Sequence, residues 1–110
     1  MFCGIAAGEI PATIVSAHSR TIAFRDINPQ APVHVLIIPR AHHPNLAELG
    51  AAGDGLLADL VAHASEVAIA EGVADAGYRV VFNTGPQAGQ SVEHVHAHVL
   101  AGRPMSWPPG

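Results

Sequence analysis

Lysine is absent from this chain of 110 residues, and its five basic residues are all arginines scattered along the sequence. Without lysine there can be no P-loop lysine, no Schiff base and no lysine nucleophile. Scattered arginines and a net charge of −4 also argue against nucleic-acid binding, which needs clustered positive charge. Any phosphate bound here must be held by backbone N–H groups, hydroxyls, imidazoles or arginine.

Cysteines and long apolar runs are also scarce. The single cysteine, Cys3, excludes an internal disulfide and favours a reducing compartment. No run approaches the roughly 18 apolar residues of a membrane span, and no charged and apolar leader opens the chain. We therefore expect a cytoplasmic protein without a membrane partner.

The length fits a single domain over residues 1–110. Short β-rich runs predict strands over residues 13–16, 21–25, 33–38 and 78–83, with a fifth strand through a histidine-rich run near the end. Apolar spacing of three and four predicts a helix over 54–72, with Asp54 as N-cap and Gly72 as C-terminal stop, and a short helix is expected over 2–8. This order predicts an α+β fold, with a mostly antiparallel five-stranded sheet, one long helix and one short helix.

The histidine-rich run places His94, His96 and His98 on alternate residues. In an extended strand successive side chains point to opposite faces, so the three imidazoles share one face. The intervening Val95, Ala97 and Val99 then face a core. A strand with imidazoles on one side suits chemistry near neutral pH, where histidine can both gain and lose a proton.

Three interpretations of this run are open. The histidines could be satisfied surface or core residues. They could also bind zinc, although one strand cannot easily wrap three rings around one ion. Such a site would recruit a further ligand from His34, His42, His43 or Cys3.

The third interpretation is nucleophilic attack on phosphorus by a neutral imidazole, whose second nitrogen must be held by an acceptor. A glycine-rich loop over residues 84–91 leads into the histidines and supports this interpretation. Its segment Gly89-Gln90-Ser91 can bring backbone N–H groups and a hydroxyl close to an anion.

The segment from Gly89 to Val99 resembles the signature of the histidine triad (HIT) superfamily. The ending Trp-Pro-Pro-Gly at 107–110, with matches elsewhere along the chain, is similar to the Hint branch. The resemblance implies a single HIT domain that forms a homodimer and hydrolyses purine nucleoside phosphoramidates, releasing AMP or GMP. It implies a metal-independent reaction without a cofactor.

The same resemblance assigns catalytic roles. His96 is the expected nucleophile, and it forms a nucleotidyl-histidine intermediate. His98 and Ser91 are expected to contact the phosphate and assist departure of the amine. His94 is expected to order the site through its backbone carbonyl, and His34 completes a hydrogen-bonded chain of histidines.

Nucleotide contacts are expected at Asp26 on the ribose and at Phe24 and Ile27 around the base, although these could be a turn residue and plain core residues. Contacts with ribose and phosphate are expected from Asn83, Gly89, Gln90 and Ser91. The tail over residues 103–110 is expected near the partner's active site, where Trp107 would influence substrate choice, unless the tail is simply a disordered terminus.

The chain departs from some bacterial relatives that carry a Cys-x-x-Cys pair for structural zinc. Here Cys3 is followed by Gly4, Ile5 and Ala6, so we expect no structural zinc. The other histidines, His18, His42, His43 and His63, are expected in a loop or on the surface. Two alternative functions stay open: a HIT enzyme acting on dinucleoside polyphosphates, phosphosulfates or other nucleotide anhydrides, and a purine-nucleotide-binding regulatory protein.

Overall fold

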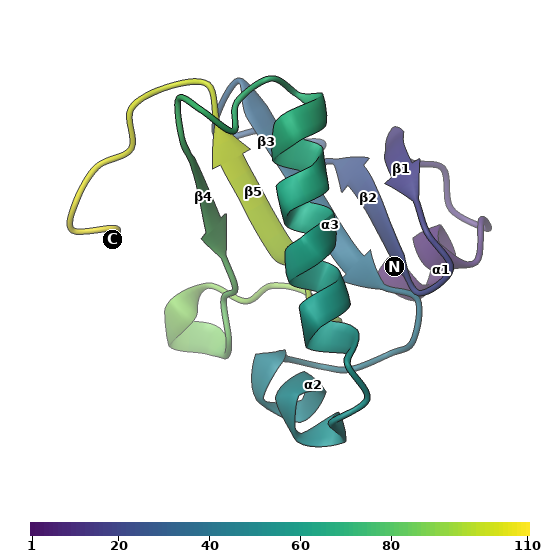
Figure 1. Ribbon diagram of the computed structural model, residues 1–110. Helices are drawn as coiled ribbons and strands as arrows, with labels where there is room; N and C mark the ends of the chain where they lie inside the picture. Colours follow the sequence, from purple (N-terminus) through teal and green to yellow (C-terminus); the bar gives the residue numbers. More distant parts are fainter.

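Five antiparallel strands form one sheet in the computed structural model, which describes residues 1–110. The strands are β1 (Ile14–Ala17), β2 (Thr21–Arg25), β3 (Val33–Pro39), β4 (Tyr78–Val81) and β5 (Ala97–Ala101), in the order β1-β2-β3-β5-β4. The helices are α1 (Phe2–Ala6), α2 (Leu46–Ala52) and α3 (Leu56–Ala70), with a 3-10 helix, η1 (Pro86–Ala88), in the loop before β5. The α+β class and the five-stranded sheet are confirmed (Figure 1).

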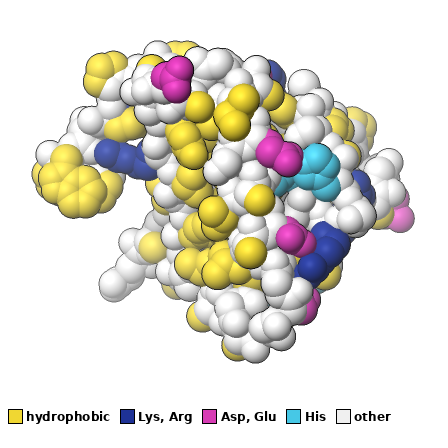
Figure 2. Space-filling view, in the orientation of Figure 1, with side chains coloured by type: hydrophobic (Ala, Val, Ile, Leu, Met, Phe, Trp, Pro, Cys, Tyr) yellow, Lys and Arg dark blue, Asp and Glu magenta, His cyan; other side chains and the backbone are white.

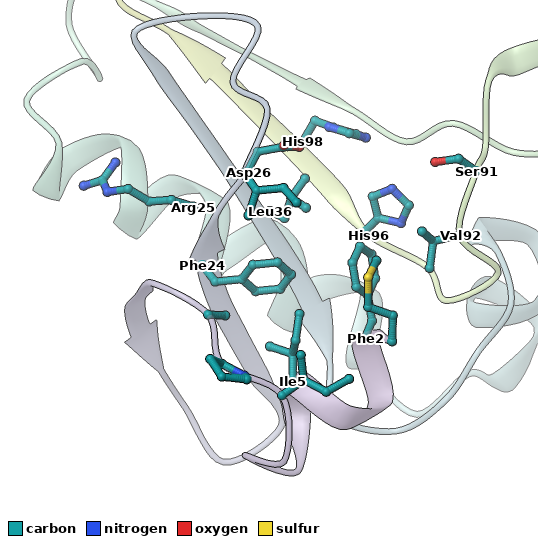
Figure 3. Close-up of a pocket in the computed structure, with 15 residues that line it drawn as sticks. Phe2, Ile5, Phe24, Arg25, Asp26, Leu36, Ser91, Val92, His96 and His98 are labelled. Atoms are coloured by element: carbon teal, nitrogen blue, oxygen red, sulfur yellow. The ribbon is translucent and has the colours of Figure 1, made fainter.

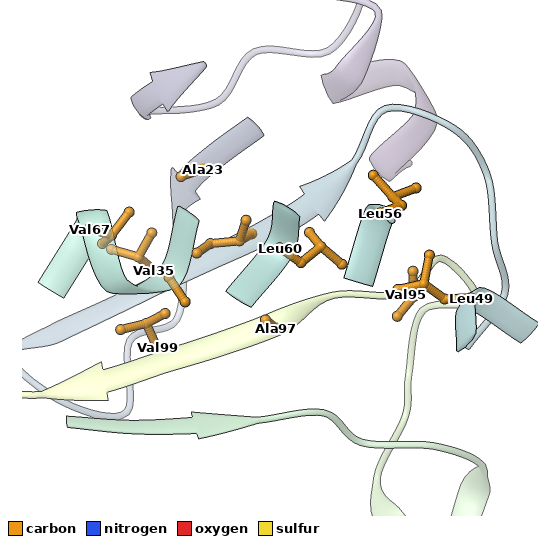
Figure 4. Close-up of a cluster of buried hydrophobic side chains, with 11 residues drawn as sticks. Ala23, Val35, Leu49, Leu56, Leu60, Val67, Val95, Ala97 and Val99 are labelled. Atoms are coloured by element: carbon orange, nitrogen blue, oxygen red, sulfur yellow. The ribbon is translucent and has the colours of Figure 1, made fainter. Parts of the chain in front are cut away.

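The sheet is covered on both faces, and alternation along β3 shows this directly. Val35 and Ile37 belong to the larger core cluster, which packs beneath α3 (Figure 4). Leu36 and Ile38 belong to a second cluster on the opposite face, together with Phe2 of α1. Because alternate side chains of a strand point to opposite faces, a strand covered on both sides is apolar almost throughout.

Helix α2 was missed because its seven residues offer little apolar periodicity, with Leu49 as the one buried side chain. A local signal was present nevertheless. Asn45 caps α2 by accepting the N–H of Glu48 at 3.0 Å, which is N-cap geometry. The helix ends at Gly53, whose φ of 64° is the left-handed conformation that glycine adopts freely.

The predicted ends of the long helix were partly wrong. The N-cap of α3 is Gly55, while the Asp54 carboxylate accepts the N–H of Leu56 at 3.2 Å. Gly72 does stop the helix, with a φ of 74° directly after the C-cap residue. None of the helices has both the length and the apolar character needed to cross a membrane.

The prediction for His63 was also wrong: its side chain is 1% exposed instead of facing solvent. His63 lies three residues after Leu60 and four before Val67, so it occupies the buried stripe of α3. Its Nε2 contacts the Ser16 hydroxyl at 2.6 Å and its Nδ1 contacts the Thr21 hydroxyl at 2.8 Å. A buried imidazole is tolerated here because both ring nitrogens have hydrogen-bond partners.

The histidine-rich run is less regular than a continuous strand, because β5 begins only at Ala97. Strand β3 ends at Pro39, and a proline has no N–H to donate to a neighbouring strand. The Pro39 carbonyl lies 2.9 Å from Nε2 of the His94 ring. Alternation of faces nevertheless continues through the run. Val95 packs in the core beneath α3, while the His94 and His96 rings contact Phe2 on the opposite side.

Candidate active site

A cavity of about 320 Å³ opens on the α1 side of the sheet (Figure 3). Six of the residues predicted to bind nucleotide or catalyse line it together: Phe24, Asp26, Ile27, Ser91, His96 and His98. The N-terminal segment adds apolar walls that the sequence analysis did not assign, among them Phe2 and Ile5 of α1. Their spacing of three residues along a short helix was the available signal.

His96 is held with one ring nitrogen free. Its Nδ1–H donates to the backbone carbonyl of His94 at 2.8 Å, as the sequence analysis expected. A carbonyl oxygen only accepts, so Nδ1 carries a proton, and in the neutral ring the lone pair is on Nε2. Every fully buried side-chain nitrogen has a hydrogen-bond partner, whereas Nε2 of His96 has none within the protein. Nε2 is therefore not buried, and because His96 lines the cavity, this atom faces it. A neutral imidazole in this tautomer can act as a nucleophile.

His34 and His98 form the expected chain behind the cavity. His34 Nε2 lies 2.9 Å from His98 Nδ1, and the His98 ring lies 4.9 Å from the ring of His96. Burial lowers the pKa of His98 to about 4, with help from His96 and His34 and opposition from Asp26. Burial also lowers the pKa of His34, which the Asp26 carboxylate partly offsets. Both rings are therefore neutral at pH 7.

His94 does not line the cavity. Its Nε2–H donates to the Pro39 carbonyl at 2.9 Å, which leaves the lone pair on Nδ1. Burial lowers the pKa of His94, and this outweighs the Pro39 hydrogen bond, which favours the charged form. The backbone of His94 thus fixes the His96 tautomer, while its own ring is fixed by β3.

The glycine-rich loop brings Ser91 to the cavity, but not the other predicted contacts: Asn83, Gly89 and Gln90 are absent from the lining. The Gln90 amide holds the loop together instead. Its oxygen accepts the Gly85 N–H at 2.9 Å, and its nitrogen donates to the carbonyls of Pro44 and Val92 at 2.6 and 3.1 Å. The Gln90 side chain therefore serves to shape the loop that presents Ser91.

The C-terminal tail leaves Trp107 83% exposed and outside the cavity lining. Arg79 anchors the tail by donating to the Ser106 carbonyl at 2.9 Å. Tryptophan is highly buried on average, so the large exposed fraction of this indole is unusual.

A group of potential metal ligands lies beside His94. Cys3 Sγ is 3.4 Å from His42 Nδ1 and 3.3 Å from His94 Nδ1, and the two nitrogens are 3.3 Å apart. These separations fit three corners of a zinc tetrahedron with bonds of about 2.0–2.3 Å. Ala6 has no ligand atom in its side chain, so a fourth ligand would have to come from elsewhere, and the absence of structural zinc stays a prediction. Zinc there would tie α1 to the segment before β5, away from the free nitrogen of His96.

Two other groups bring three potential ligand atoms within 4.8 Å of one another. Asp26, His34 and His98 form one, in which the two imidazoles already contact each other. His18, His63 and Glu66 form the other, on the α3 side of the sheet.

Comparison with known proteins adds an independent finding. The model of the HIT domain family matches residues 7–105. Adenylylsulfatase HINT1 of Arabidopsis thaliana is 45% identical, with 100% of this chain and 76% of that protein aligned. The purine nucleoside phosphoramidase of Escherichia coli is 42% identical, with 96% and 88% aligned. A crystal structure of a HIT family hydrolase from Legionella pneumophila has a TM-score of 0.96 at 49% identity, covering 100% of this chain and 98% of that one.

Proposed function

Since this chain belongs to the HIT domain family, we propose that it is a nucleotide hydrolase that cleaves the P–N bond of purine nucleoside phosphoramidates. One observation carries the proposal: Nε2 of His96 faces the cavity without a protein partner, while its Nδ1 is held 2.8 Å from the His94 carbonyl. In the neutral ring, that arrangement directs the lone pair of Nε2 into the cavity as a nucleophile.

The proposed reaction has two steps. His96 Nε2 bonds to the α-phosphorus, the P–N bond breaks, and the amine leaves after taking a proton from water in the open cavity. The ring then carries a positive charge, which the His94 carbonyl stabilises through Nδ1–H. Water attacks the phosphorus in the second step, Nε2 leaves with its electron pair, and the spare proton returns to solvent. The net reaction consumes one water and releases a nucleoside monophosphate.

His98 and Ser91 are the proposed contacts for the phosphoryl oxygens and the departing amine, because both line the cavity beside His96. Hydrogen-bond donors are suited to this task, since negative charge spreads over those oxygens during transfer. His34 and His94 act from behind, on His98 and His96 respectively.

For the nucleoside, we propose that the Asp26 carboxylate accepts from the ribose hydroxyls. One of its oxygens already accepts the Asn28 N–H at 2.8 Å, which fixes the side chain at the rim. Phe24 forms part of the apolar wall for the base. Ile27 is 98% exposed at the same rim, where a bound base would cover it. Direct contacts from Asn83 and Gly89 stay a prediction.

A second candidate is hydrolysis of a nucleoside phosphosulfate, which the name of the Arabidopsis thaliana relative favours. The same nucleophile would attack the same phosphorus, and sulfate would leave in place of the amine. Sulfate leaves without taking a proton, so this reaction should depend less on a proton source than amine departure does.

The proposed assembly is a homodimer built through the α3 and β4 side of the molecule. Val61 and Ile69 of α3 are 52% and 69% exposed, and Tyr78 and Val80 of the edge strand β4 are each 38% exposed. Figure 2 shows hydrophobic side chains gathered over this region and at the tip of the projecting tail. Exposed apolar side chains on an edge strand and the neighbouring helix mark a surface for association, and a second copy would also give Trp107 a partner surface. Sedimentation should give a dimer, and Val61→Glu should shift it towards monomer.

The test of the proposed activity is hydrolysis of a fluorogenic adenosine phosphoramidate by protein pretreated with a chelator. We expect turnover without added metal. Activity that disappears with the chelator and returns with zinc, while the free energy of unfolding is the same with and without the chelator, would contradict the nucleophilic mechanism. Slow turnover of every phosphoramidate and phosphosulfate, with tight AMP binding, would favour a nucleotide-binding regulatory protein instead.

A further inference from the structure

The hydrogen bond between His34 and His98 has a direction that decides what the site offers a substrate. With both rings neutral, one nitrogen of the pair donates and the other accepts. If His34 donates from Nε2, then His98 accepts at Nδ1 and its own proton sits on Nε2, facing the cavity. If the direction is reversed, His98 faces the cavity with a lone pair, which would repel a phosphoryl oxygen.

The backbone of the β2–β3 loop selects one direction. The Gln30 N–H donates to His34 Nδ1 at 3.0 Å, so this nitrogen is an acceptor and the His34 proton lies on Nε2. On the opposite side of the ring, an Asp26 carboxylate oxygen lies 3.4 Å from Nε2 and likewise favours a proton there. In the reverse tautomer, a ring N–H would face the Gln30 N–H, and a lone pair would face the carboxylate.

The loop is braced so that the Gln30 N–H stays in place. The Asp26 N–H donates to the His34 carbonyl at 3.0 Å and closes the loop at its base. The Gln30 side chain donates to the Asn28 carbonyl at 3.0 Å, and Arg103 donates to the Gln30 carbonyl at 2.9 Å. His34 is 5% exposed, so water cannot easily replace the backbone donor.

We propose that the backbone N–H of Gln30 is a positioning group of this site: it fixes His34 as the Nε2–H tautomer, and His34 thereby makes His98 present an N–H to the cavity. The consequence for catalysis rests on the proposed function, because the His98 N–H matters only if a phosphoryl group is bound. The tautomers themselves are properties of the free protein. Burial lowers the pKa of His34 and of His98, which favours the neutral state of both rings.

The experiment is nitrogen-15 NMR of the histidine rings in the free protein at pH 7. Long-range proton–nitrogen correlations should show His34 and His98 both protonated at Nε2 and bare at Nδ1. Scalar couplings across hydrogen bonds should join the Gln30 amide to His34 Nδ1, and His34 Nε2 to His98 Nδ1. Protonation of His98 at Nδ1 would overturn the proposal, whatever the protein's activity.

A matched pair of variants tests the role of Gln30. Both variants lose the side-chain hydrogen bond from Gln30 to the Asn28 carbonyl. Gln30→Pro also loses the backbone N–H, whereas Gln30→Ala keeps it and should retain both couplings. In Gln30→Pro the His34 and His98 tautomer ratios should move by about fivefold, the equivalent of one hydrogen bond. Its kcat should fall severalfold, with little change in KM. Unchanged ring signals in Gln30→Pro would overturn the proposal.

If Gln30→Pro does not fold, the wild-type couplings still decide the question. A correct tautomer pattern in a protein that hydrolyses no nucleotide would refute the proposed function and leave the tautomer assignment intact. The two failures are thus distinguishable.

Discussion

Histidines lie in two groups on opposite faces of the same sheet, and the hydrogen bonds of their buried members differ. On the α3 side, both nitrogens of His63 are occupied by the hydroxyls of Ser16 and Thr21. On the α1 side, His96 and His98 each have one nitrogen fixed from behind and the other facing the cavity. Burial of an imidazole is therefore common to structural and chemical roles. The free nitrogen is what distinguishes them.

The largest loss of activity is expected at His96. His96→Ala should lower kcat by about a thousandfold or more, because removal of a nucleophile leaves only binding and charge stabilisation. AMP affinity should change by only a fewfold, as the apolar wall and Asp26 are untouched. Turnover and isothermal titration calorimetry with AMP measure the two effects. Near-normal turnover in this variant would contradict a chemical role for the free nitrogen of His96.

His63→Ala should affect stability instead of activity. It removes a side chain that is 1% exposed and unpairs two hydroxyls, so the free energy of unfolding should fall by about 3 kcal/mol. Urea denaturation measures the loss, and His63→Gln, which can keep one hydrogen bond, should lose less. Hydrolysis per folded molecule should match the wild type. A kcat loss comparable to that of His96→Ala would place His63 in the chemistry.

Protonation of histidines in both groups should destabilise the fold in mild acid. Burial lowers the pKa of His34, His63, His94 and His98 below the ordinary 6.5, so the unfolded chain takes up protons first as the pH falls. Stability is then fully present above pH 6.5 and is lost towards pH 4, the range set by His98. His98 alone should account for about 2 kcal/mol after allowance for its partial exposure. Denaturation at pH 7 and pH 4.5 measures the loss, which should shrink in His98→Asn. An equal loss in that variant would contradict the assignment to His98.

The smallest effect is expected at the exposed end of the α3-side group. His18 Nε2 lies 2.6 Å from Glu66 Oε2, but the two side chains are 47% and 61% exposed. Water and salt screen such a pair, so Glu66→Gln should cost less than about 0.5 kcal/mol of stability. Thermal denaturation at low and high salt is the measurement. A loss as large as that of His63→Ala would mean that the ring of His63 depends on this pair.

Much of the fold could be predicted from local pattern. A short β-rich run located β2 at residues 21–25, and a run of apolar residues located β3 as a strand covered on both faces. The surface position predicted for His63 was wrong. Histidine as a residue type is often exposed, but its spacing from Leu60 and Val67 places it on the buried stripe of α3. Helix α2 was missed because a short helix with one buried residue has little periodicity.

The site was partly predictable for a different reason. The alternation of His94, His96 and His98 with apolar residues already separated imidazoles from the core. The resemblance to the HIT superfamily implied the His94 carbonyl as the partner of His96, which the structure places at 2.8 Å. Gln30 gave no signal, since its contribution is a backbone N–H aimed by the folded loop and not by the type of its side chain. Similarly, the ligand spacing of Cys3, His42 and His94 depends on contacts between distant segments.

The central claim is that the free nitrogen of His96 bonds to the nucleotide's phosphorus during turnover. Acid-quenched turnover of an adenosine phosphoramidate, followed by peptide mass spectrometry, tests it directly. We predict an adenylyl adduct on the peptide containing His96, absent from His96→Ala. Rapid turnover with no adduct at any quench time, or an adduct on a different residue, would contradict the account.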